Sequence, residues 1–170
     1  MTMPECRFSI GDSSESKLQF TEEGIRRFAE MSGDANPLHH DIDFAKNSRF
    51  GGLIACASEC TARMIGAVAV FLAGKGGALG LGCAFNYRQA IHAGETLALR
   101  WNITEIEEKP KLKGHLVTLR GLLERTDGGV CVEATFNAVV MPPEAMLTSS
   151  FSENEKGSDA ERPGQQALPE

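Results

Sequence analysis

The sequence lacks the cysteine pairs that hold zinc, and it has no excess of basic residues. Its 5 cysteines contain no C-x-x-C motif, which excludes a zinc site built on such pairs. With 17 basic and 23 acidic residues, the formal net charge is −6. Nucleic acid is therefore not expected as a partner, since phosphate binding needs a basic surface. We expect reduced thiols and no metal ion. The cysteines are Cys6, Cys56, Cys60, Cys83 and Cys131.

The N-terminus lacks the basic segment and apolar run that mark a secretory signal. The longest apolar run, Leu53–Gly74, contains Glu59 and Arg63. Each charge would cost about 2.5–3.5 kcal/mol at the centre of a bilayer. The run is better interpreted as a helix of a soluble fold. The sequence thus predicts a cytoplasmic protein that does not bind membranes.

The length of 170 residues, with 42% hydrophobic residues, suits one domain. Beyond Pro143 the chain is poor in apolar residues and rich in Ser, Glu, Gly and Pro, a composition typical of disorder. We predict a single domain over residues 1–143 and a disordered tail over residues 144–170.

Helices are predicted in the first half of the chain. Thr21 can cap a first helix, which Gly33 should end. Asp41 can cap a short second helix. Leu53–Leu72 is apolar around most of a helical circumference, so we expect a long helix wrapped by other structure.

Strands are predicted in the second half, where the apolar period changes to two. Gly74–Gly82 is interpreted as a turn-rich link before the first strand. Turns at short spacing indicate an antiparallel sheet, and with the long helix this gives an α+β fold. One sheet leaves exposed edges, which a homodimer or larger homo-oligomer would cover. The predicted strands are Cys83–Ile91, Thr96–Ile106, Leu116–Glu124 and Val130–Met141.

The segment "MSGDANPLHHD", residues 31–41, combines turn residues with an acid and an imidazole. Pro37 stiffens the backbone between Asp34 and His39, so this loop can hold an acid–base pair at a fixed separation. An isolated Asp and His at this spacing are more often a capping acid and an ordinary polar residue. The two residues alone leave both interpretations open.

The longer segment "FAEMSGDANPLHHDIDFA", residues 28–45, resembles the signature of the MaoC-like (R)-specific enoyl-CoA hydratases and dehydratases. The segment "FNYRQAIHAGETLALRWNITEI" is similar to the F-x-x-P-V-x-x-G-D-x-L strand pair of that family. Ala90 stands where proline is common there, and Glu95 where Asp is common. The resemblance extends from about Cys6 to Met141. It implies a hotdog fold, in which a curved antiparallel sheet wraps around one long central helix.

The resemblance also implies roles for individual residues. Asp34 and His39 would be the catalytic pair, and Asn36 would help to hold the loop. A backbone N–H at the start of the long helix polarises the thioester carbonyl in this family, from the glycine of a His-Gly step. Cys56 and Ala57 occupy that step here, so Ala57 would be the donor.

The implied activity is that of a hydro-lyase acting on an acyl thioester. It would convert trans-2-enoyl-CoA to (R)-3-hydroxyacyl-CoA, or carry out the reverse dehydration. The thioester substrate would be carried by coenzyme A or by acyl carrier protein, and no cofactor is implied. Two alternatives stay open: a hotdog acyl-CoA thioesterase, and a non-catalytic subunit that binds acyl thioesters.

Polar residues of the long helix allow more than one interpretation. Ser58 and Glu59 could contact substrate, but Glu59 and Arg63 lie one turn apart and could equally form an ion pair. Basic residues could also contact the phosphates of coenzyme A, although an ordinary solvated surface explains each of them as well. These are Lys46, Arg49, Lys75 and Arg88.

Overall fold

The computed structural model describes residues 4–143 and residue 145, so the predicted tail over 144–170 lies outside the described residues apart from Ala145. The described residues form five strands, three α-helices and two short 3-10 helices. In chain order these are β1 (Ser13–Gln19), α1 (Glu22–Ser32), η1 (Pro37–His39), α2 (Ile42–Asn47), α3 (Ala57–Ala73), β2 (Gly77–Tyr87), β3 (Thr96–Lys109), η2 (Pro110–Leu112), β4 (Gly114–Glu124) and β5 (Val130–Met141).

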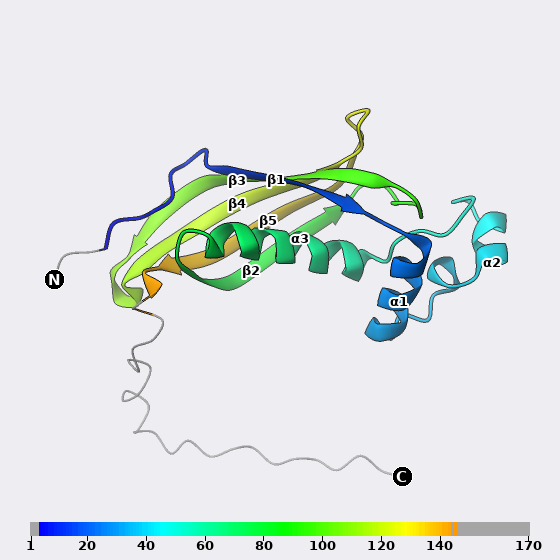
Figure 1. Ribbon diagram of the computed structural model, residues 1–170, viewed down its shortest axis with the longest axis horizontal. Helices are drawn as coiled ribbons and strands as arrows, with labels where there is room; N and C mark the ends of the chain where they lie inside the picture. The colour runs from blue at the N-terminus through cyan, green and yellow to red at the C-terminus, as the bar shows by residue number, and fades with distance from the viewer. Residues whose placement is uncertain (1–3, 144, 146–170) are drawn as a thin grey trace, which may run out of the picture.

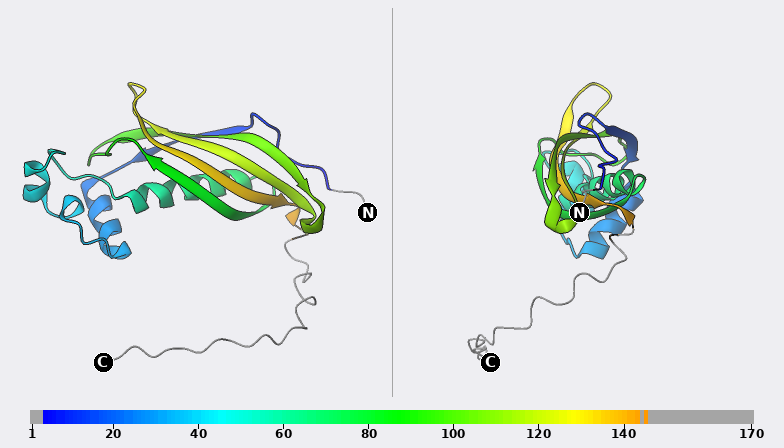
Figure 2. Two further views of the ribbon diagram at one scale, coloured as in Figure 1. Left: turned by 180° about the vertical axis from the view of Figure 1, so that it is seen from behind. Right: turned by 90° about the vertical axis from the view of Figure 1, so that its left-hand side faces the viewer.

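The strands form one antiparallel sheet in the order β1-β3-β4-β5-β2. The sheet is curved, and α3 runs along its concave face (Figures 1 and 2). Helices α1 and α2 lie beyond one end of the sheet, next to the N-terminus of α3 (Figure 1). The predicted α+β arrangement of a curved sheet around one long helix is confirmed.

Helix α1 begins and ends, and helix α2 begins, where their capping residues predict. The hydroxyl of Thr21 accepts a hydrogen bond from Gly24 N–H at 3.0 Å, and Gly33 ends α1 at a φ of 73°. The carboxylate of Asp41 accepts from Phe44 N–H at 3.0 Å and caps α2. Both ends of the loop between α1 and α2 are therefore fixed by local hydrogen bonds.

Helix α3 begins four residues later than predicted, at Ala57. The preceding residues are extended: Ala55 N–H donates to Ile91 O at 2.8 Å, and Leu53 O accepts from Ala93 N–H at 3.0 Å. A short apolar run cannot be assigned to helix or strand from its composition. Here hydrogen bonds to a distant segment of the same chain decide. Within residues 4–143, no helix is both long and apolar enough to cross a bilayer.

The described residues cover one side of α3, so the helix is less enclosed than its apolar circumference suggested. Its buried apolar stripe consists of Cys60, Met64, Val68 and Leu72, spaced four residues apart. On the opposite side, Val70 is 76% exposed. The high alanine content made the helix look apolar all round, although only this stripe is fully buried; Ile65, Ala67 and Phe71 are partly buried against the same core.

Strand β2 begins six residues earlier than predicted and ends four residues earlier, at Tyr87. The glycine-rich segment interpreted as a link is therefore mostly strand, paired with β5 from Gly77–Met141 to Tyr87–Val132. A Cβ on Gly80 would lie 3.0 Å from the ring of Phe136, so glycine allows β5 to approach closely. This contact is invisible in a local sequence pattern.

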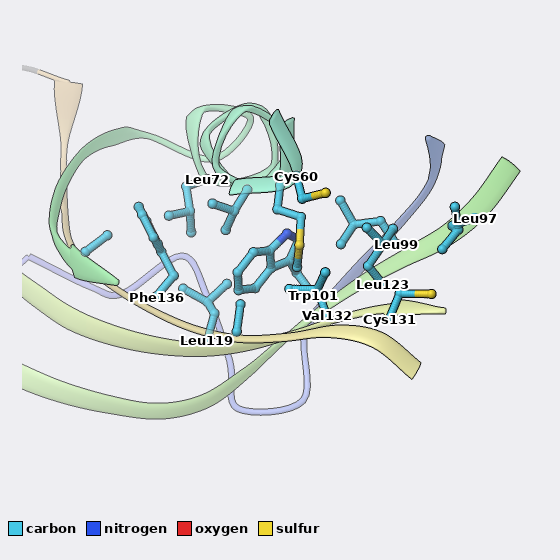
Figure 3. Packing of buried hydrophobic residues seen from close by; sticks show 14 of the residues in the cluster. Cys60, Leu72, Leu97, Leu99, Trp101, Leu119, Leu123, Cys131, Val132 and Phe136 are labelled. Atoms are coloured by element: carbon cyan, nitrogen blue, oxygen red, sulfur yellow. The ribbon is translucent and has the colours of Figure 1, made fainter. Parts of the chain in front are cut away.

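The core lies between α3 and the sheet, and Trp101 is its largest fully buried side chain. Figure 3 shows the indole of Trp101 between Cys60 of α3 and the strands below. Its cross-strand neighbour is Gly121, where a Cβ would lie 2.6 Å from the indole. Trp101 also meets Phe136 edge-to-face, with centroids 6.2 Å apart. Close packing of this kind fixes α3, and hence its N-terminus, against the sheet.

Candidate active site

A pocket of about 560 Å³ opens where the N-terminus of α3 meets the loop between α1 and α2. Four of the five site residues predicted from the sequence line it: Asp34, Asn36, His39 and Ala57. The fifth, Ser58, is exposed in the first turn of α3 and is not among the lining residues. The fold thus brings a carboxylate, an imidazole and a helix N-terminus to one cavity.

The loop that carries the carboxylate is held by hydrogen bonds of its own residues. Asp34 N–H donates to Ala29 O at 2.9 Å, which anchors the loop on α1. Asp34 Oδ1 accepts from Asn36 N–H at 3.1 Å, and Asn36 Oδ1 accepts from Leu38 N–H at 3.1 Å. Pro37 begins the short helix η1. Asn36 therefore lies where it can hold the loop between Asp34 and His39.

The imidazole of His39 is buried and oriented by a backbone carbonyl. Its Nδ1 lies 2.8 Å from the carbonyl oxygen of Ile54. A carbonyl oxygen only accepts hydrogen bonds, so Nδ1 carries the hydrogen in this contact. In the neutral ring, the lone pair is then on Nε2. Nε2 is consequently the nitrogen that can accept a proton.

This nitrogen faces Asp34. Its distance to Asp34 Oδ2 is 3.5 Å, longer than a good direct hydrogen bond. The Asp34 side chain is 35% exposed, whereas that of His39 is 8% exposed. The neighbouring His40 holds the main chain at Asp34, because its Nε2 lies 2.5 Å from the backbone oxygen of Asp34. One water molecule in contact with both Nε2 and Oδ2 fits this spacing.

The N-terminus of α3 supplies an unused hydrogen-bond donor. Cys56 is the N-cap residue, and its side chain makes no capping hydrogen bond. Within residues 4–143, no group accepts a hydrogen bond from Ala57 N–H. The first N–H groups of any helix lack helical partners, and the helix dipole makes this end electropositive. Ala57 N–H can therefore donate to a partly negative oxygen in the pocket.

Apolar and hydroxyl-bearing side chains form the remaining wall. Ile54, Ile91 and Val132 line it, as does Tyr87, whose hydroxyl bonds to that of Thr61 on α3. Cys60 also lines the pocket, but burial raises the pKa of its thiol to about 12. A thiol of that pKa stays protonated at neutral pH, so Cys60 is not an activated nucleophile.

Two of the four candidate phosphate contacts lie at the pocket. Arg49 and Arg88 line it, and Arg88 also pairs with Glu133 at 2.9 Å. Lys75 lies past the opposite end of α3, where its Nζ pairs with Asp12 at 2.7 Å. Lys46 is exposed on α2 and is not among the lining residues.

Sequence reasoning did not single out Ile54 or Tyr87 as part of the site. Ile54 contributes a backbone oxygen, which no side-chain motif reveals. Tyr87 belongs to the "FNYRQA" segment noted above, but its position at the end of β2 follows from strand pairing. Both residues enter the site through contacts between distant segments.

The sequence matches a known protein family. A family model described as a MaoC like domain matches residues 9–121, about two thirds of the chain. The match includes the signature at residues 28–45, the whole of α3 and the strand pair that follows. The family predicted from that signature is confirmed. No curated protein sequence matches the chain.

Solved structures share the fold at low sequence identity. The (R)-hydratase from A. caviae involved in PHA biosynthesis is 23% identical and superposes with a TM-score of 0.71, covering 80% of this chain and 98% of that one. R-hydratase PhaJ1 from Pseudomonas aeruginosa is 24% identical, with a TM-score of 0.70 and coverage of 79% and 83%.

A third structure is a complex, the C-terminally truncated HadBC (3R-hydroxyacyl-ACP dehydratase) from Mycobacterium tuberculosis. It is 20% identical, with a TM-score of 0.66 and coverage of 76% of this chain and 96% of that one. At this level of identity the three likenesses show the fold alone, and the predicted hotdog fold is confirmed.

Proposed function

Because the chain belongs to the MaoC-like family, we propose that it is a hydro-lyase acting on acyl thioesters, with hydration of trans-2-enoyl-CoA to (R)-3-hydroxyacyl-CoA as its reaction. The observation that carries the proposal is the pocket shared by Asp34, His39 and Ala57. Hydration needs a base for water, a proton for Cα and a donor for the enolate oxygen. These three residues supply groups of the required chemistry.

In the proposed mechanism, Asp34 and His39 hold one water between Oδ2 and Nε2. His39 accepts a proton from this water as its oxygen attacks Cβ of the enoyl group. The pair then returns the proton to Cα, so water is added across the double bond. The hydrogen bond from Nδ1 to Ile54 O supports this role, because it leaves the lone pair on Nε2. Such proton transfers typically contribute about 10²–10⁴-fold to a rate.

Ala57 N–H is proposed to donate a hydrogen bond to the thioester oxygen, where negative charge develops. This group is the first of α3, and the helix dipole adds to its attraction for an anion. Loss of one such donor costs about 10²–10³-fold in other enzymes. Arg49 and Arg88, at the same pocket, are proposed to contact phosphates of coenzyme A or of the acyl-carrier prosthetic group.

One assay tests the reaction and separates it from the alternatives. Purified protein is mixed with crotonyl-CoA, and loss of the enoyl absorbance is followed beside release of free thiol. A hydratase removes the chromophore without releasing thiol. Thiol release that keeps pace with the loss of absorbance would instead identify a thioesterase, because hydrolysis also destroys the conjugated thioester. Binding without either change would identify a non-catalytic acyl-binding subunit.

The assembly is proposed to be a homodimer formed through β2. Within the described residues, β2 pairs only with β5 and leaves its other edge open. Its 11 residues contain no charged residue and no proline, the features that usually protect an exposed edge. Leu81 on this strand is 62% exposed. A second copy offers the same edge and can pair with it about a two-fold axis, beside the pocket that Tyr87 lines.

A further inference from the structure

A buried carboxylate near the proposed catalytic pair has no role in the mechanism above. Glu59 lies in the first turn of α3, and its side chain is only 4% exposed. Its Oε1 accepts a hydrogen bond from Arg63 Nη1 at 3.2 Å. No described group donates to Oε2, although that oxygen is buried. The interpretation of Glu59 and Arg63 as an ion pair is thus correct but explains only one of the two oxygens.

Arg63 does not need Glu59 to stay in place. Its Nη1 also donates to Gln19 O, at the end of β1, at 2.7 Å. Its guanidinium lies over the ring of Phe20, 4.5 Å from the centroid. These two contacts already join α3 to β1. A purely structural ion pair would therefore not require a buried carboxylate with one oxygen unpaired, which is costly inside a protein.

The unexplained carboxylate and His39 are both buried, and both are anchored to the segment at the start of α3. Burial raises the pKa of the Glu59 carboxyl, while Arg63 and, more weakly, the positive charge of His39 oppose that rise. His39 is bonded to Ile54 O, just before α3, and Glu59 N–H bonds to the N-cap carbonyl of Cys56, so both residues are held at the N-terminus of α3. Electrostatic coupling is reciprocal, so a charge on Glu59 also acts on His39.

We propose that Glu59 is a positioning residue of the active site that acts through His39: its buried carboxylate stabilises the imidazolium formed when His39 takes a proton from water. The inference rests on the proposed hydratase function. Asp34 faces the same imidazole from the loop after α1 but is more exposed, so its charge is better screened by solvent. Arg63 faces Glu59 from α3, and its positive charge opposes the rise in the pKa of the Glu59 carboxyl. Glu59 and Asp34 would then flank the imidazolium from two different elements.

The test compares Glu59→Gln with wild-type protein in the hydration of crotonyl-CoA across a pH range. We expect kcat to fall roughly tenfold with KM nearly unchanged, because the His39 imidazolium loses its attraction to the Glu59 carboxylate. The acidic limb of the kcat profile should also move to lower pH, since the base is protonated less readily. Unchanged kcat and an unmoved limb would reduce Glu59 to a structural partner of Arg63. A rise in KM alone would make it a substrate contact and likewise overturn the proposal.

The matched control is Glu22→Gln. Glu22 forms the same type of i,i+4 pair with Arg26 on α1, at 3.1 Å, but its side chain is 52% exposed. This variant should keep wild-type kcat and the wild-type pH profile. A loss equal to that of Glu59→Gln would show that any broken Glu–Arg pair slows the reaction and would overturn the proposal.

A second measurement needs neither turnover nor a folded Glu59 variant. The carboxyl carbon of Glu59 is titrated by NMR in wild-type protein and in His39→Gln. The pKa of Glu59 should rise further in His39→Gln, because the opposing charge is removed. An unchanged titration would show that the two side chains do not interact. If wild-type protein fails to hydrate enoyl thioesters, the proposed function fails, while this titration still decides whether Glu59 and His39 are coupled.

Discussion

His39 Nε2 lies 3.5 Å from Asp34 Oδ2, and a carbonyl 15 residues further along the chain orients the ring for this contact. The acid and the imidazole come from one short loop, but the tautomer of the imidazole is set by Ile54, just before α3. The geometry of the pair therefore depends on docking of that loop against the segment that leads into the central helix.

Asp34→Asn and His39→Gln should each lower the hydration rate of crotonyl-CoA by about 10²–10⁴-fold. Asp34→Asn keeps the side-chain shape and His39→Gln keeps a polar side chain of similar length, but each removes a group that holds or deprotonates water. Asp41→Asn is the matched control, because an asparagine can still cap α2. Loss of enoyl absorbance gives the rates. Near wild-type turnover in either site variant would remove that residue from the mechanism.

Ala57→Pro should remove the oxyanion donor without breaking α3. Proline is favoured at the first helical position, and Cys56 before it is already extended, at φ −71° and ψ 149°. We expect a decrease in kcat of about 10²–10³-fold. Ala57→Val retains the N–H while adding bulk and should be much less affected. Equal losses in the two variants would indicate steric obstruction of the pocket rather than loss of a donor.

Leu81→Lys should convert the proposed dimer to a monomer, because a charge would be placed on the unpaired edge of β2. Light scattering should give a mass near twice 18.3 kDa for wild-type protein and near 18.3 kDa for the variant. Cys83, exposed on the same strand of the single chain, should react slowly with a thiol reagent in the dimer and rapidly in the variant.

Ile10→Lys is the control for that experiment, since Ile10 is 67% exposed but precedes β1, at the other edge of the sheet. It should leave the mass unchanged. A monomeric wild-type protein would refute assembly through β2.

Glu95→Gln should destabilise the fold at pH 7 by about 1–2 kcal/mol. Hydrogen bonds from Arg125, at 2.5 and 3.0 Å, lower the pKa of the Glu95 carboxyl, and the bond from His92 N–H adds to this effect. Because the pKa of Glu95 is lower in the folded than in the unfolded state, its ionisation stabilises the fold at every pH above the unfolded-state pKa. That contribution is lost as the pH falls through the folded value.

Urea unfolding of wild-type protein and Glu95→Gln should therefore differ at pH 7. The difference should begin to shrink below the unfolded pKa of about 4.3 and vanish once the pH has fallen through the lower folded-state pKa. Glu15→Gln breaks a more exposed pair with Arg100 and should change stability little at either pH. A difference for Glu95→Gln that persists unchanged at low pH would show that ionisation of Glu95 is not its source.

Features with local causes could be predicted from the sequence. Thr21, Gly33 and Asp41 fix helix ends through hydrogen bonds or backbone angles within a few residues. Helix α1 begins and ends as predicted, and α2 begins as predicted. Strand β5 has its predicted bounds, because its apolar alternation is regular and clear turns bound it. The loop of Asp34, Asn36 and His39 was recognisable because its turn, proline and acid–base residues lie within one continuous segment.

Features with distant causes required the tertiary structure. The start of α3 at Ala57 depends on hydrogen bonds of residues 53–55 with residues 91–93, and the glycine-rich part of β2 is a strand because β5 pairs with it. The burial of Glu59 and the orientation of His39 by Ile54 likewise arise between segments far apart in sequence. The sequence by itself determined both ends of α1, the start of α2, the loop between them and the family. Only the tertiary structure decided which groups share the pocket. Hydrogen bonds and packing between remote segments produce no pattern that can be recognised in the local sequence.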